Sequence, residues 1–202
     1  MNRLLKYPSY LFHPIWMPFA GTFIYFLKVP RFFPEEVIKA KLMAVAIMTL
    51  FIPIVFFFML RTLNQARGIF LESVEERKWP LLFYCVIQLV ILQYIVNRFD
   101  FMELYHFYKG ILISTLVTAV FVYFKKKISL HLVGLTGLIG FMVVLSYFYK
   151  LNMIPLIAIL MIISGLTATS RLHMKAHTSG ELFWGTVVGF TPQILVLQLW
   201  FV

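Results

Sequence analysis

Apolar residues gather in seven runs along the chain, and short polar stretches separate these runs. The runs are Ile15–Leu27, Leu42–Leu60, Leu81–Val96, Ile111–Phe124, Leu132–Tyr149, Met153–Thr169 and Leu182–Phe201. About 20 apolar residues in a helix cross a bilayer. Several runs are shorter than this, so we expect their helices to extend into the polar flanks. The pattern predicts an all-α, polytopic transmembrane bundle with six to seven spans, and residues 1–202 form one domain.

The first run is the least regular of the seven. Pro18 lies inside it and Pro14 stands just before it. Because proline removes a backbone donor and clashes with the preceding turn, we expect this segment to be kinked or to span the membrane only in part. The six later runs alternate between the two membrane faces whatever the first one does.

The loops between runs therefore fall on two faces. If all seven runs span, the N-terminus lies on one membrane face, which we call face A. The opposite membrane face is face B. Loops 61–80, 125–131 and 170–181 lie on face A, and loops 28–41, 97–110 and 150–152 lie on face B. The candidate chemistry described below lies in the three loops of face A.

Composition supports a membrane protein and narrows its partners. The chain is 61% hydrophobic and 13% charged, which excludes a soluble domain, and its formal net charge is +10. Basic loops suit anionic lipid headgroups and anionic substrates, whereas no basic and aromatic soluble surface exists for nucleic acid. Cys85 is the one cysteine, so an intramolecular disulfide is excluded, and its apolar run indicates a packing role.

The longest polar stretch of the C-terminal half runs from Ser170 to Glu181. His177 and Glu181 are four residues apart, so on a helix they share one face. The carboxylate can then accept the Nδ1–H of the imidazole, which leaves Nε2 as a base or nucleophile. Arg171 stands six residues before His177 and meets it only if the chain breaks between them. Arg171 would then close one helix, and His177 would lie near the start of the next.

This stretch resembles the third signature of the type 2 phosphatidic acid phosphatase superfamily, Ser-Arg-x5-His-x3-Asp. Ser170, Arg171 and His177 match it, and Glu181 replaces the aspartate. The resemblance implies that His177 takes the phosphoryl group, that Glu181 orients it, and that Arg171 and Ser170 belong to the phosphate site. The whole chain is similar to small multi-span members from Bacteroidetes-type bacteria, which implies a multi-pass protein of the bacterial inner membrane with a periplasmic site.

The start of the fifth run resembles the family's second signature, Pro-Ser-Gly-His. Ser129 and His131 match it, whereas Ile128 and Leu130 replace the proline and the glycine. The resemblance implies that His131 protonates the leaving oxygen and that Ser129 binds phosphate. Lys127 stands beside them as a further phosphate ligand, and a triple-lysine patch at the membrane surface with an interfacial histidine is the alternative interpretation of this loop.

The start of the third run resembles the first signature, Lys-x6-Arg-Pro. Arg77 matches the arginine, Pro80 is displaced, and Phe70 stands where the family has lysine. Arg67 or Lys78 is the candidate replacement for that lysine. A guanidinium group suits phosphate because it binds two oxygens at once, although a solvated charge run that caps a helix is the alternative interpretation.

The resemblance implies a lipid phosphate or lipid pyrophosphate phosphatase that needs no metal or cofactor and forms a phosphohistidine. Its partners would be membrane lipids and a lipid phosphate substrate, such as undecaprenyl pyrophosphate, phosphatidic acid or phosphatidylglycerophosphate. A related phosphotransferase, a non-catalytic subunit of a membrane complex, and a metal-dependent membrane hydrolase with ligands His173, His177 and Glu181 are the alternatives. We expect His13 and His106 to lie away from the site.

Two further patterns bear on this interpretation. Thr178-x-x-Glu181 is also a capping box, which would only begin a helix. Face A carries 11 Lys and Arg residues against 7 on face B, which would put face A in the cytoplasm. Without Arg77, Lys127 and Arg171 the balance is 8 to 7, so charge does not oppose the periplasmic site that the resemblance implies.

Overall fold

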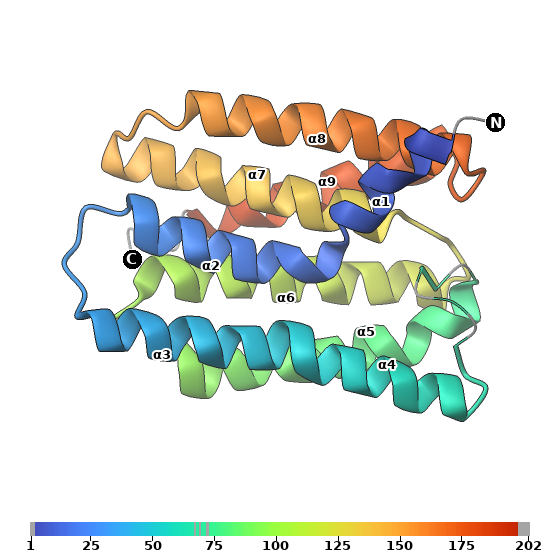
Figure 1. Cartoon of the computed structure of the whole chain (residues 1–202), viewed down its shortest axis with the longest axis horizontal. Coiled ribbons are helices and arrows are strands. Elements are labelled where there is room, and N and C mark those ends of the chain that lie inside the picture. The colour runs from blue at the N-terminus through green and yellow to red at the C-terminus, as the bar shows by residue number, and fades with distance from the viewer. Residues whose placement is uncertain (1–2, 67, 69, 72, 198–202) are drawn as a thin grey trace.

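The computed structural model describes residues 3–66, 68, 70–71 and 73–197. All regular elements of these residues are helical, which confirms the predicted all-α bundle. The elements are η1 (Arg3–Lys6), α1 (Tyr7–Leu11), η2 (Pro14–Trp16), α2 (Met17–Lys28), α3 (Glu35–Ala46), η3 (Ile47–Phe51), α4 (Ile52–Thr62), α5 (Val74–Val90), η4 (Ile91–Ile95), α6 (Met102–Tyr123), α7 (Leu130–Tyr149), α8 (Ile154–His173) and α9 (Ser179–Leu197). The long helices run side by side along the longest axis (Figure 1).

Five of the described helical stretches are long and apolar enough to cross a bilayer, so the chain is a membrane protein. They are Glu35–Thr62, Val74–Ile95, Met102–Tyr123, Leu130–Tyr149 and Ile154–His173. Each one extends beyond its apolar run into polar flanks, as the short runs predicted. The first stretch joins α3 and α4 through the π-helical turn η3, which lies just before Pro53, a residue that cannot donate a backbone hydrogen bond.

The N-terminal part of the chain is broken, as its prolines predicted. Pro14 begins η2 after the extended residue His13, and α2 follows with 12 residues. At roughly 1.5 Å per residue, α2 is about 18 Å long, shorter than the hydrocarbon core of about 30 Å. We call residues 3–16 the N-terminal segment. It lies across the ends of α7 and α8, so it covers one end of the bundle.

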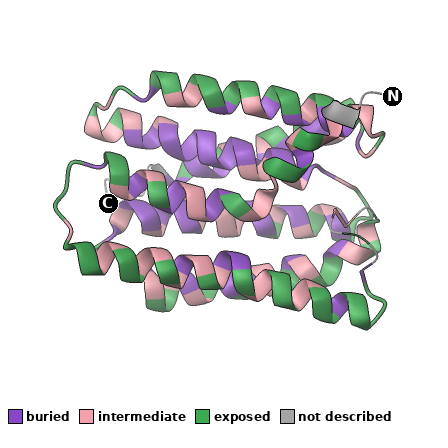
Figure 2. Cartoon of the chain, viewed as in Figure 1, coloured by how far each residue is buried: buried purple, intermediate pink, exposed green. Residues whose placement is uncertain are grey.

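Helix α7 forms the centre of the bundle, and its middle turns are buried (Figure 2). Small residues bring α9 against it. A Cβ atom at Gly189 would lie 2.3 Å from the carbonyl oxygen of Val133, and one at Gly140 would lie 2.9 Å from Cβ of Gln193. Glycine at these positions therefore allows the two backbones to approach closely, as small residues do between membrane helices.

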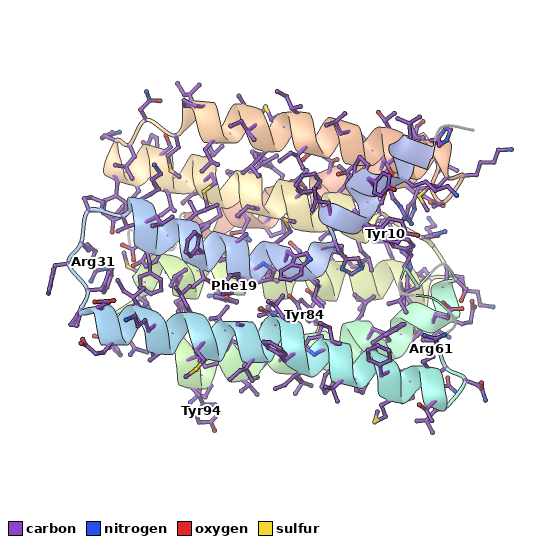
Figure 3. All side chains as sticks on the ribbon, in the orientation of Figure 1. Tyr10, Phe19, Arg31, Arg61, Tyr84 and Tyr94 are labelled. Atoms are coloured by element: carbon purple, nitrogen blue, oxygen red, sulfur yellow. The ribbon has the colours of Figure 1, made fainter. Side chains whose placement is uncertain are left out.

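The bundle has two polar ends that correspond to the predicted faces. Tyr10 and Arg61 lie at one end, with the N-terminal segment and the α8–α9 loop, and Arg31 lies at the other (Figure 3). Tyr84 lies between these ends and Tyr94 points away from the bundle. The first end is face A, and the three loops that carry the candidate motifs meet there.

Candidate active site on face A

The chain breaks between Arg171 and His177, as their spacing required. Helix α8 ends at His173, and Lys175 takes a left-handed conformation with a φ of 53°. The N–H of Ala176 then donates to the carbonyl oxygen of Arg171 (3.0 Å), and the N–H of Lys175 donates to that of Leu172 (2.9 Å). This is a Schellman ending, with lysine in the position that glycine usually takes. The reversal returns His177 toward Arg171.

His177 and Glu181 form the predicted pair. The Nδ1 of His177 lies 2.6 Å from Oε2 of Glu181, and the imidazole is buried. Thr178 and Glu181 also form the capping box of α9, because the N–H of Glu181 lies 3.3 Å from Oγ1 of Thr178 and the N–H of Thr178 lies 3.4 Å from Oε2. Glu181 therefore both begins the helix and orients the ring, with the Nδ1–H donated to the carboxylate.

Burial lowers the pKa of His177 well below its usual range, and the positive charges of Arg77, Lys127 and Arg171 lower it further. The imidazole is therefore neutral at physiological pH. With its Nδ1–H held by Glu181, its lone pair is on Nε2. Lys127 also holds the loop in place, because its Nζ donates to the carbonyl oxygen of Ala176 at 2.8 Å.

Arg77 joins the other two loops of face A. Its side chain is buried, its Nε donates to the carbonyl oxygen of Leu71 (2.8 Å), and its Nη1 donates to that of Ile128 (2.6 Å). Leu71 has a φ of 46°, which is uncommon for a leucine and aims its carbonyl group at the guanidinium. One arginine thus links the loop before α5 to the start of α7.

A small cavity lies where these loops meet. Its volume is about 40 Å³, close to that of a single water molecule. It is lined by His13, Pro14, Phe70, Leu71, Arg77, Leu130, His131, Arg171 and His177. Arg77, His131, Arg171 and His177, four of the residues that the motifs singled out, therefore line one buried space.

His131 begins α7 and is held by the N-terminal segment. Its Nε2 lies 3.0 Å from the backbone carbonyl oxygen of Ser9, so we assign the hydrogen of this bond to Nε2. The hydroxyl group of Ser9 in turn lies 2.7 Å from that of Ser170. These two contacts attach the N-terminal segment to both α7 and α8.

The other predicted ligands lie outside the lining of this cavity. Ser170 is buried against Ser9, and Lys78 is exposed. Ser129 is buried, and its N–H donates to the carbonyl oxygen of Glu181 (3.1 Å), which ties α7 to α9. Lys127 acts on His177 through its charge and on the loop through its hydrogen bond. Arg67 lies outside the described residues.

Two residues of the site were missed or misjudged from sequence. The expectation that His13 lies away from the site is wrong, because its ring meets that of His131 edge-on at 5.4 Å and it lines the cavity. Phe70, at the position of the family lysine, lies 4.8 Å from the guanidinium carbon of Arg171. It supports that arginine through a cation–π contact. The placement of the N-terminus on face A was the available signal for His13.

The metal alternative required His173, His177 and Glu181 on one continuous helix. Helix α8 ends at His173, and His177 lies in the loop before α9, so that spacing does not produce a shared face. No group of three His, Cys, Asp or Glu side chains suited to a metal ion occurs within the residues that the structure describes.

The face A site combines a neutral, oriented imidazole with a cavity lined by guanidinium groups. Comparisons of the chain with protein-family models, with curated proteins and with solved structures gave no match. The interpretation of the site therefore depends on its own residues and geometry.

Proposed function

We propose that the protein is a membrane lipid phosphate or lipid pyrophosphate phosphatase that works through a phosphohistidine at His177. One observation carries the proposal: His177, oriented by Glu181 at 2.6 Å, lines the same buried cavity as Arg77 and Arg171. An imidazole in this state is a nucleophile, and two guanidinium groups suit the oxygens of a phosphoryl group.

The electrostatics of the site favour an anion. Arg77, Lys127 and Arg171 all act on His177, and Glu181 is the carboxylate paired with it. Burial strengthens such charges because little water screens them. As a phosphoryl group passes through the transition state, the guanidinium groups would stabilise the charge on its oxygens.

A second, larger cavity supports a lipid as substrate. It has a volume of about 440 Å³, which is typical of a ligand pocket. Apolar side chains of α4, α5, α6 and α7 line most of it, among them Phe57, Leu81, Ile111 and Val133. It adjoins the small cavity, so a substrate could place its phosphate against His177 and its chain inside the bundle.

The reaction would take two displacements. In the first, Nε2 of His177 bonds to phosphorus, the bond from phosphorus to the lipid-side oxygen breaks, and that oxygen leaves with the electron pair and gains a proton. In the second, water attacks the phosphohistidine and its oxygen bonds to phosphorus. The bond from phosphorus to Nε2 breaks and returns its electron pair to nitrogen, the attacking water gives up a proton, and inorganic phosphate leaves. The family pattern would assign the proton donor to His131.

The small volume of the polar cavity adds a requirement. About 40 Å³ leaves little room beyond a single water molecule, so we expect its lining to widen when the substrate binds. The N-terminal segment contributes His13 and Pro14 to that lining. Because this segment does not span the membrane, we expect it to move more readily than the helices that line the rest of the cavity.

The test is phosphate release from a lipid phosphate and a lipid pyrophosphate by detergent-solubilised protein. We expect His177→Ala to abolish release from both, whereas the exposed Lys78→Ala variant keeps the wild-type rate. Acid-labile phosphate should be trapped on the wild type and absent from His177→Ala. Wild-type rates in His177→Ala would refute the proposal.

A further inference from the structure

The small cavity at face A and the larger cavity inside the bundle meet at a shared wall. Four residues line both of them, namely His13, Pro14, Leu71 and Leu130. The small cavity holds the charged groups and the large one is apolar. If the proposed function holds, a substrate with its phosphoryl group in one and its chain in the other places its lipid-side oxygen at this wall. Among these four residues, His13 is the one whose side chain can carry a proton.

The local structure holds His13 at this wall. The residue is extended, with a φ of −64° and a ψ of 138°, between the end of α1 and the proline that begins η2. Its Nδ1 lies 3.4 Å from the backbone nitrogen of Ile15, and its ring lies beside those of His131 (5.4 Å) and Phe70 (6.2 Å). A proline after it and two aromatic neighbours restrict where the imidazole can lie.

His131 is less suited to the same task. Its Nε2 is hydrogen-bonded to the carbonyl oxygen of Ser9 at 3.0 Å, and the side chain is buried. Delivery of that hydrogen to a leaving oxygen would break the contact that attaches the N-terminal segment to α7. In addition, His131 lines only the small cavity, whereas His13 lines both cavities.

We propose that His13 is the proton donor to the leaving lipid oxygen, and that His131 positions the N-terminal segment. This proposal rests on the proposed function. In a lipid monophosphate, as the bond between phosphorus and the lipid oxygen breaks, the electron pair stays on oxygen, which takes the Nε2 proton of the His13 imidazolium and becomes the lipid alcohol. When water then attacks the phosphohistidine, its oxygen bonds to phosphorus, the bond from phosphorus to Nε2 of His177 breaks with its electron pair on nitrogen, and one water proton returns to Nε2 of His13.

A bound substrate favours the charged form of His13, and the local structure opposes that form only weakly. A bound phosphoryl dianion favours the charged form of an imidazole beside it. The contact from Ile15 is already at the long limit of a hydrogen bond, so its loss when Nδ1 is protonated costs little. The neutral product then retains the hydrogen on Nδ1.

The test uses two phosphomonoesters with the same chain length, one an alkyl ester and one an aryl ester. An alkyl oxide is a poor leaving group and needs a proton, whereas an aryl oxide leaves without one. We expect His13→Ala and His13→Gln to slow release from the alkyl ester by about 10²–10⁴-fold and from the aryl ester by less than about tenfold. Retained hydrolysis of the aryl ester would also show that these variants fold.

The control variant is His131→Ala, which should slow both esters to a similar degree. Equal loss on both esters in His13→Ala would overturn the assignment, as would a loss confined to the alkyl ester in His131→Ala. Failure of the proposed function has a different signature, because the wild type would then release no phosphate from either ester, or His177→Ala would remain active. That result would remove both proposals.

Discussion

The two ends of the bundle both bury charge, but with a different balance of positive and negative groups. At face B the carboxylate of Glu103 is buried and accepts hydrogen bonds from the hydroxyl groups of Tyr25 (3.0 Å) and Tyr149, and from Arg31 (3.3 Å). At face A the cations Arg77, Lys127 and Arg171 surround His177, with Glu181 as its paired carboxylate.

This difference in charge balance indicates that the Glu103 cluster at face B is a structural contact and that the cluster around His177 at face A is a candidate site. The Glu103 cluster joins α2, the loop after it, α6 and α7, and none of its four residues lines either of the two cavities described above. Its charges are matched within the protein. At face A the positive charge exceeds the negative charge next to a cavity, which is the arrangement that an anionic ligand would balance.

Of the changes that compare the two ends, the one at face A should have the largest effect. Arg171→Ala should lower phosphate release by about 10²–10³-fold, because one group that stabilises the transition-state charge is lost. The melting temperature should change little, because the loss of a cation from a positive cluster offsets the loss of the contact with Phe70. Initial rates per folded molecule and thermal unfolding in detergent measure both quantities. A lower melting temperature with an unchanged rate would make the face A cluster structural, like that of Glu103.

The matching change at face B should act on stability alone. Glu103→Gln replaces the carboxylate that accepts hydrogen bonds from two tyrosines and Arg31 with a neutral amide. Hydrogen bonds to a charged group contribute about 1.5–3 kcal/mol each, so we expect a loss of roughly 2–4 kcal/mol. For a chain of this length that lowers the melting temperature by about 4–16 °C. The rate of the folded fraction should match the wild type, and a selective loss of rate would give face B a part in function.

A smaller effect should appear in the pH dependence of stability. The pKa of His177 is lowered in the folded protein, mainly by burial. Below the ordinary histidine pKa the unfolded chain binds a proton that the folded state does not, so stability falls as pH falls. Between pH 7.5 and 5, the wild type should lose up to about 1.4 kcal/mol per pH unit more than His177→Gln. The opposite slope would mean that Glu181 holds a charged imidazole.

The two ends should also differ in their side of the membrane. We expect an impermeant thiol reagent to label Ser179→Cys on face A from the periplasm, and Asn152→Cys on face B only after lysis, both in a Cys85→Ala background. Both positions are exposed. The reverse pattern would place the site in the cytoplasm.

Much of face A followed from spacing along the chain. The spans, the break after Arg171 and the pair of His177 with Glu181 all depend on residues within one or two helical turns of each other, where helix geometry decides what meets. The parity of the loops predicted that three motifs share a face. The contact of Arg77 with the carbonyl oxygen of Ile128 depends on tertiary packing, and no pattern in the sequence indicates it.

The position of the N-terminal segment could not be predicted from spacing along the chain, for a physical reason. Pro14 and Pro18 predicted a break, but the direction of the chain after a break depends on what it packs against. The contacts of Ser9 with His131 and Ser170 join residues more than a hundred positions apart. From sequence, Phe70 marked only the absence of the family lysine. Its contact with Arg171 depends on tertiary packing, so the sequence did not indicate it.

The close approach of α7 and α9 fixes the starts of these two helices relative to each other, whereas the N-terminal segment is not held by that contact. A Cβ atom at Gly185 would lie 2.7 Å from the carbonyl oxygen of Ser129, and the N–H of Ser129 donates to Glu181. The helices that carry His131 and Glu181 therefore move as one body, so the distance between the start of α7 and the start of α9 is preset before any substrate arrives. Widening of the polar cavity is then left to the N-terminal segment, and amide hydrogens in residues 3–16 should exchange with solvent sooner than those at the start of α7.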